Sequence, residues 1–151
     1  MSTVLKTSAL SEILANARVV AEREGLPYAG GVVPQAAWEL FVTGEAVLVD
    51  VRSAEERKFV GQVPDTLHVA WANGTGLTRN PRFVRELEAK VPKDKVVLFL
   101  CRSGKRSALA AEAATVAGYS NAFNVLEGFE GDLNDQQQRG TKSGWRFYGY
   151  S

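Results

Sequence analysis

The chain reads VVLFLCRSGKRSALAA from residue 96 to residue 111. The five apolar residues at its start predict a fully buried strand, and the alanine-rich run from about Ser107 to Ala117 predicts a helix that Gly118 ends. A tight loop that begins with Cys101 joins the two. Because a buried strand followed by a loop and a helix is the building unit of parallel α/β sheets, this stretch decides the fold class.

Cys101 occupies a setting that favours ionisation of its thiol. The loop carries Arg102, Lys105 and Arg106, and its backbone amides and the start of the next helix direct positive charge toward its centre. A cysteine buried in the core as a small apolar residue is the alternative, but such a cysteine is not normally followed by Arg-Ser-Gly-Lys-Arg. Open α/β sheets also bind their ligands at strand ends. We therefore predict that Cys101 is a catalytic thiolate.

The remaining segments extend the α/β pattern along the chain. Further strands are expected near residues 32–33, 46–51, 67–70 and 122–126. Helices are expected at residues 8–24, 35–43 and 81–91, and a short helix is expected after its cap, Ser53. Strands that alternate with helices predict an α/β fold with a central parallel sheet and helices on both faces.

Composition narrows the functional classes. The chain has 151 residues, a net charge of +1, one cysteine and one histidine. The near-neutral charge gives no reason to expect nucleic acid or a membrane surface as a partner. Because no run of 18 apolar residues and no signal-peptide pattern occur, we expect a cytoplasmic protein. A single cysteine suits a reducing compartment, and with one histidine no metal site is expected.

Three further motifs accompany the cysteine loop. They are LVDVRSAEE at 48–56, GQVPDTLHV at 61–69, and NVLEGF at 124–129 followed later by Gly144-Trp145. Together with the loop, in this order and spacing, they closely resemble the rhodanese (sulfurtransferase) family over about residues 32–150. The resemblance implies a rhodanese-like three-layer fold with a five-stranded parallel sheet. Residues 32–151 would then form this domain, preceded by an N-terminal amphipathic helix and connector at 1–31.

The resemblance also implies a chemistry and a site. The cysteine of this family takes a sulfane sulfur from a small anionic donor such as thiosulfate and passes it to a thiol, to cyanide or to a protein, without a cofactor. Cys101 matches the family nucleophile, while Asp50 and Arg52 match a pair that supports the site. The substrate-binding cradle corresponds to Arg102, Ser103, Gly104, Lys105, Arg106 and Ser107. The two serines could instead be simple turn and cap residues.

Loop length separates two enzyme classes. Tyrosine-type phosphatases, some of them rhodanese-like, use Cys-x5-Arg, in which the arginine clamps phosphate. Position 107 is serine here, so the nearest pattern is Cys-x4-Arg, ending at Arg106. In the resembled family this shorter loop accompanies sulfur transfer, which makes an arsenate- or phosphate-processing relative the less favoured enzyme. A sulfur-relay or sensing module that serves a partner protein stays open as an alternative.

Two departures from the family pattern stand out. The usual Gly-His-Ile-Pro is replaced by residues 61–64, Gly-Gln-Val-Pro, and the usual Gly-Phe-x-Gly-Trp ending is interrupted by residues 132–143. This polar insertion is expected to be a surface loop, and the other hypothesis is a flap that selects the acceptor. His68 lies within a predicted strand, so a structural role is expected rather than general-base catalysis.

Overall fold

The structure is a computed structural model that describes residues 3–73 and 78–129. The predicted insertion at 132–143 and the Gly144-Trp145 pair lie outside the described residues.

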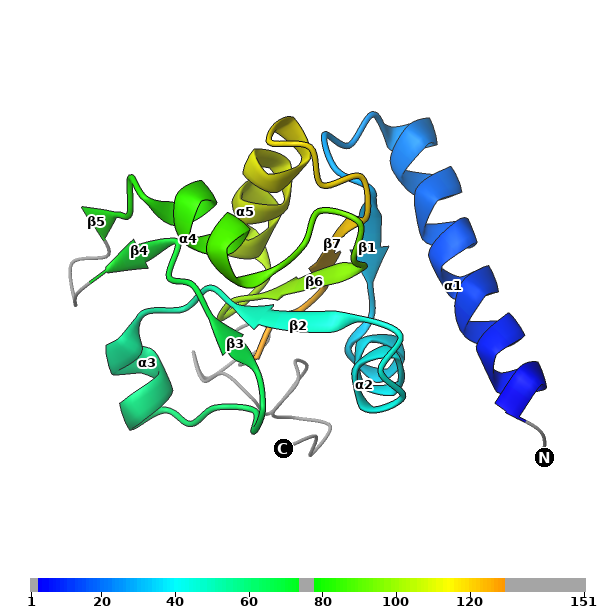
Figure 1. Ribbon diagram of the computed structural model, residues 1–151, viewed down its shortest axis with the longest axis horizontal. Coiled ribbons are helices and arrows are strands. Elements are labelled where there is room, and N and C mark those ends of the chain that lie inside the picture. The colour runs from blue at the N-terminus through cyan, green and yellow to red at the C-terminus, as the bar shows by residue number, and fades with distance from the viewer. Residues whose placement is uncertain (1–2, 74–77, 130–151) are drawn as a thin grey trace, which may run out of the picture.

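A five-stranded parallel sheet forms the centre of the molecule and confirms the predicted fold class (Figure 1). Its order is β1 (Gly30–Val32), β7 (Ala122–Val125), β6 (Val97–Leu100), β2 (Val47–Asp50) and β3 (Leu67–His68). All neighbouring pairs run parallel, with Asp50 opposite Leu100 and Phe99 opposite Asn124. The carboxyl ends of β2, β6 and β7 therefore lie at the same edge of the sheet, and Cys101 directly follows β6.

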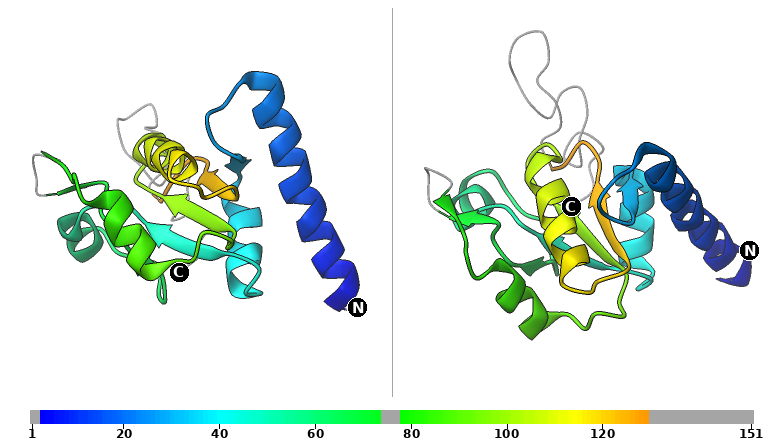
Figure 2. Two further views of the ribbon diagram at one scale, coloured as in Figure 1. Left: turned by 45° about the horizontal axis from the view of Figure 1, so that its top comes forward. Right: turned by 90° about the horizontal axis from the view of Figure 1, so that it is seen from above.

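Helices cover both faces of this sheet (Figures 1 and 2). On one face, α4 (Phe83–Lys90) and α5 (Lys105–Val116) share a core cluster with Val49, Val97 and Phe99. On the other face, α1 (Thr3–Glu24) and α2 (Pro34–Val42) share a second cluster with Leu48 and Leu98. Adjacent strand residues therefore alternate between the clusters. This explains why the central strands read as continuous apolar runs.

The helix boundaries follow local chemistry. Gly104 has a φ of 102°, a left-handed conformation that glycine adopts without strain. Helix α5 begins directly after it, at Lys105, which is two residues earlier than the expected start at Ser107. The short α3 (Ala54–Phe59) begins after Ser53, as predicted, because Ser53 and Glu56 form a reciprocal capping box. Lys105 and Arg106 therefore lie in the first turn of a helix.

A small antiparallel pair, β4 (Ala72–Asn73) and β5 (Thr78–Arg79), was not predicted. Its strands have two residues each, which is too short for a periodic pattern in the sequence. Backbone hydrogen bonds from Trp71 to the Val51 carbonyl and from Asn80 to the Trp71 carbonyl attach this region to the sheet.

Across residues 3–73 and 78–129, the structure contains no helix with the length and apolar character that a membrane crossing requires.

The N-terminal helix packs closely on the edge strand. A Cβ on Gly30 would lie 2.6 Å from the backbone oxygen of Ala17 in α1, whereas a Cβ on Gly44 would meet nothing within 4 Å. Both glycines have positive φ, at 155° and 79° respectively. Substitution at either position therefore introduces backbone strain. Only the substitution at Gly30 also disturbs the contact between α1 and β1.

We predict that Gly30→Ala lowers the free energy of unfolding by on the order of 2–3 kcal/mol, since it combines strain with overpacking. Gly44→Ala, the matched control, should cost about 1 kcal/mol from strain alone. Urea unfolding measures both. Equal losses for the two variants would contradict the close packing of α1 on β1.

Candidate active site

The Cys101 thiol lies at the end of β6, and the residue is 1% exposed. Its Sγ accepts a hydrogen bond from the Gly104 backbone N–H at 3.1 Å and lies 3.2 Å from the Ser107 hydroxyl oxygen. The first turn of α5 begins beside it, so the positive end of the helix dipole adds to these donors. The arrangement stabilises negative charge on sulfur.

The predicted cradle residues divide into those that meet the thiol and those that do not. Gly104 and Ser107 contact Sγ directly. Arg102 and Ser103 are half-buried, and the Nε of Arg102 is buried without a hydrogen-bond partner among the described residues. Lys105 is exposed. A backbone amide and a hydroxyl of the loop therefore contact sulfur directly.

Arg106 is engaged by a carboxylate that sequence reasoning did not connect to the site. Its Nη1 and Nη2 donate to Oε1 and Oε2 of Glu56, each at 2.7 Å. Burial would raise the pKa of Glu56, but hydrogen bonds from Arg106 and Ser53 and the charge of Arg106 lower it from 4.5 to about 2. The Ser53-x-x-Glu56 capping-box pattern is the signal that could have marked Glu56 as oriented.

The same ion pair acts on the arginine. Burial would lower the pKa of Arg106, but Glu56 outweighs it and, with smaller contributions from Cys101 and Asp50, raises the pKa. The guanidinium is therefore permanently charged and is occupied on one side by Glu56. Ser107, which stands where the phosphatase arginine would be, is completely buried.

Asp50 and Arg52 form a second, fully buried ion pair near the loop. The Arg52 Nη2 donates to Asp50 Oδ2 at 2.8 Å and to the Gly61 carbonyl at 2.8 Å, while its guanidinium stacks 4.2 Å from the centre of the Phe129 ring. The Phe129 N–H in turn donates to the Cys101 carbonyl at 2.7 Å. A continuous set of contacts therefore links the end of β2 to the cysteine.

His68 lies at the rim of this cluster. Its Nε2 is 2.7 Å from the Arg52 carbonyl oxygen, and the side chain is half-buried. This contact indicates that His68 supports the segment that follows β2.

Asn124 is a site residue whose part in the site was missed. It is 4% exposed, its Oδ1 accepts from the Ser107 hydroxyl at 2.5 Å, and its Nδ2 donates to the Gly104 carbonyl at 3.1 Å. An asparagine between the buried Phe123 and Val125 is the sequence signal, because a buried amide needs hydrogen-bond partners.

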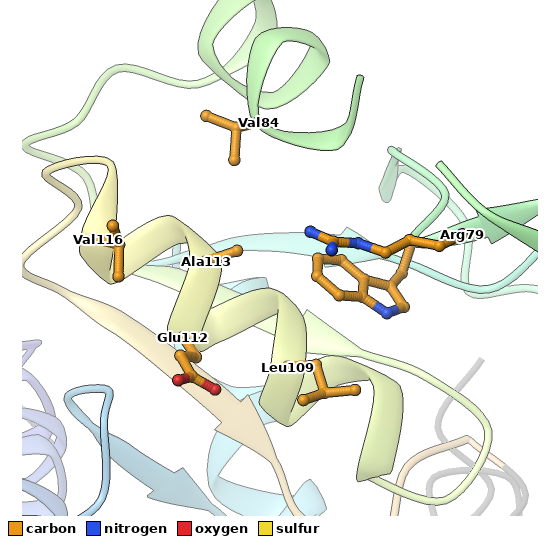
Figure 3. Close-up of a pocket in the computed structure, with 7 residues that line it drawn as sticks. Arg79, Val84, Leu109, Glu112, Ala113 and Val116 are labelled. Carbon is orange, nitrogen blue, oxygen red and sulfur yellow. The ribbon is translucent and has the colours of Figure 1, made fainter. Parts of the chain in front are cut away.

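A separate groove of about 400 Å³ lies between α4 and α5 (Figure 3). Arg79 lies over the Trp71 ring at 4.4 Å from its centre, and apolar side chains line the remainder. These are Val84, Leu109, Ala113 and Val116, with Glu112 at one side. No residue of the Cys101 loop belongs to this lining.

The chain is similar to known proteins in sequence and in fold. A family model described as the rhodanese-like domain matches residues 33–135. An uncharacterized protein of Rickettsia prowazekii is 36% identical over 112 residues, which cover 72% of this chain and 89% of that protein. Human thiosulfate:glutathione sulfurtransferase is 35% identical over 89 residues, which cover 56% and 76%. The crystal structure of Rv0390 from M. tuberculosis matches with a TM-score of 0.72 and 48% identity, and the match covers 81% of this chain and 95% of that one.

The Glu56–Arg106 pair predicts a pH-dependent stability. Because the pKa of Glu56 is lower in the folded protein, its contribution is fully present above about pH 4.5 and is lost as the pH falls toward about 2. Glu56→Gln should lower the free energy of unfolding by on the order of 1–3 kcal/mol at pH 6, and by much less near pH 2. Urea unfolding at several pH values measures this. Glu55→Gln in the same helical turn is the control, and an equal, pH-dependent loss there would contradict the assignment.

Proposed function

The chain belongs to the rhodanese-like family, and on that premise we propose that it is a sulfurtransferase whose Cys101 carries sulfane sulfur as a persulfide. The observation that carries the proposal is the environment of Sγ, which receives a hydrogen bond from Gly104 N–H at 3.1 Å and has the Ser107 hydroxyl at 3.2 Å. These donors favour an anionic sulfur without a separate general base.

In the first half-reaction the Cys101 thiolate attacks the outer sulfur of the donor. With thiosulfate, a new S–S bond forms to Sγ, and the donor's S–S bond breaks with its electron pair leaving on sulfite. The negative charge of the thiolate moves to the outer sulfur of the persulfide. We expect backbone N–H groups of the loop and of the first turn of α5 to stabilise that charge.

In the second half-reaction an acceptor takes the outer sulfur. A thiophilic group such as cyanide or a thiolate attacks it, the S–S bond to Sγ breaks, and the electron pair returns to Cys101 as the thiolate. The cycle is a double displacement that needs neither metal nor cofactor. We place the protein in a reducing compartment such as the cytoplasm, where Cys101 would persist as a free thiol.

Charge around the loop favours a sulfur donor over a phosphate ester. The guanidinium of Arg106 is committed to Glu56 by two hydrogen bonds of 2.7 Å, and position 107 offers a hydroxyl in place of a second guanidinium. A phosphate ester would therefore lack the second guanidinium and the bidentate clamp that phosphate recognition uses. Lys105, which is exposed, and Arg102 remain to attract a small anion.

We predict that Cys101→Ser lowers thiocyanate production from thiosulfate and cyanide to the uncatalysed rate while the protein stays folded. Serine is nearly isosteric, but its hydroxyl stays protonated near neutral pH and forms no persulfide. Intact mass spectrometry should show one added sulfur on the wild type after thiosulfate, and its loss after cyanide. An active Cys101→Ser protein would overturn the proposed function.

We also predict that Lys105→Gln raises the KM for thiosulfate about three- to tenfold with a smaller change in kcat, because an exposed charge contributes to attraction more than to the chemical step. Added salt should weaken the wild type in the same direction. Lys95→Gln, at the opposite end of β6, is the matched control. A large loss of kcat at unchanged KM would instead assign Lys105 to the transition state.

A further inference from the structure

Asn124 lies where β7 passes beneath the cysteine loop. Its strand neighbour is Phe99, one residue pair before the end of β6. The side chain is 4% exposed and contacts Gly104 and Ser107, the two residues whose N–H and O–H lie within hydrogen-bond distance of Sγ in the described part of the chain. One amide therefore reaches both donors.

The orientation of this amide follows from its partners. The Gly104 carbonyl can only accept, so the group that faces it at 3.1 Å must be the NH2 of Asn124. The carbonyl oxygen, Oδ1, then faces the Ser107 hydroxyl at 2.5 Å. Oδ1 has no proton to donate, so the bond between them must use the proton of Ser107.

Ser107 has one hydroxyl proton and two possible acceptors. Oδ1 of Asn124 lies at 2.5 Å and Sγ of Cys101 at 3.2 Å. When Cys101 carries a proton, its S–H can donate to the Ser107 oxygen while Ser107 donates to Asn124. When Sγ is negatively charged, it attracts the Ser107 proton, and Asn124 Oδ1 gives up that bond.

We propose that Asn124 is a positioning residue that acts through Ser107: it holds the hydroxyl proton while Sγ is neutral and yields it when Sγ becomes an anion. This inference deepens the proposed function, on which its account of the persulfide rests. The charge on Sγ alternates in the cycle, because it is negative in the thiolate and neutral in the persulfide. The Ser107 proton would therefore move between Sγ and Asn124 in each half-reaction.

The direction in which Asn124 affects ionisation of Cys101 follows from comparing the protonated and the thiolate states of Sγ. In the protonated state all three groups are satisfied, whereas in the thiolate state the buried Oδ1 loses a partner. Asn124 therefore restrains ionisation of Cys101, and Ser107 promotes it. The charge of Arg106 also acts on the thiol, and the test leaves it and the other charged residues of the surrounding elements unchanged. These others are Asp50, Arg52, Glu56, Arg57, Arg102, Lys105 and Glu127.

The test is the pH dependence of Cys101 alkylation by iodoacetamide, which is specific because the chain has one cysteine. Asn124→Ala should move the midpoint of the rate profile down by roughly half to one pH unit. Ser107→Ala should move it up by a similar amount. In the Ser107→Ala background, Asn124→Ala should have almost no further effect, because the route through the Ser107 hydroxyl is gone and the remaining contact of Asn124 is to the Gly104 carbonyl, not to the N–H that donates to Sγ.

Asn80→Ala is the matched control. Asn80 is also buried and donates to the Ala70 carbonyl, in a region separate from the loop, so its loss should destabilise the protein without moving the midpoint. If Asn124→Ala does not fold, Asn124→Leu, which keeps the side-chain volume but has no acceptor for the Ser107 proton, should shift the midpoint in the same direction. An unchanged or raised midpoint in the Asn124 variant, or an equal shift in both backgrounds, would overturn the proposal.

Alkylation needs no sulfur donor, so this result is independent of the proposed activity. If thiosulfate leaves no sulfur on Cys101, the proposed function fails while the coupling between Asn124 and Ser107 can still be measured. If persulfide forms but the midpoints do not move, only the role of Asn124 fails.

Discussion

The buried ion pair between Asp50 and Arg52 is the constraint on which the site depends. Both side chains are completely excluded from solvent, and removing two charges from water is costly unless further hydrogen bonds satisfy them. Here the backbone N–H of Arg52 also donates to Asp50, and the guanidinium reaches the Gly61 carbonyl and the face of Phe129. In this pair only Nη1 of Arg52 is left without a hydrogen-bond partner among the described residues. The other contacts fix the end of β2, the segment before β3 and the segment after β7 relative to one another.

Carboxylate and guanidinium groups form ion pairs in the region around the thiol. Asp50 interacts with Arg52 and Arg57, and Glu56 interacts with Arg106. Of the three loop cations, Arg106 is thereby balanced by a carboxylate from a neighbouring element. What acts on Sγ at closest range is the Gly104 amide, the Ser107 hydroxyl and the start of α5. In the proposed function, short-range dipoles rather than net charge would therefore prepare the sulfur for reaction.

Much of the fold could be predicted because its signals are local. The buried strand before Cys101, the alanine-rich helix after it and the cap at Ser53 each follow from neighbouring residues. The pairing of groups across the fold could not be predicted in this way. Glu56 meets Arg106 across 50 residues and Ser107 meets Asn124 across 17, and no periodicity in one sequence encodes such a meeting. The two-residue strands β4 and β5 were missed because they are held by tertiary contacts.

The register of β7 has a consequence for how this fold can vary. Asn124 faces the loop only because Phe99 is its partner on β6, and the residues on either side of it belong to the opposite core cluster. A single residue inserted in the strand would turn Asn124 to that other face and bring an apolar side chain beneath Ser107. Insertions and deletions that shift this strand by one position are therefore incompatible with the site, even though the sheet itself could still form. A change in length that keeps the site must therefore fall in the connections.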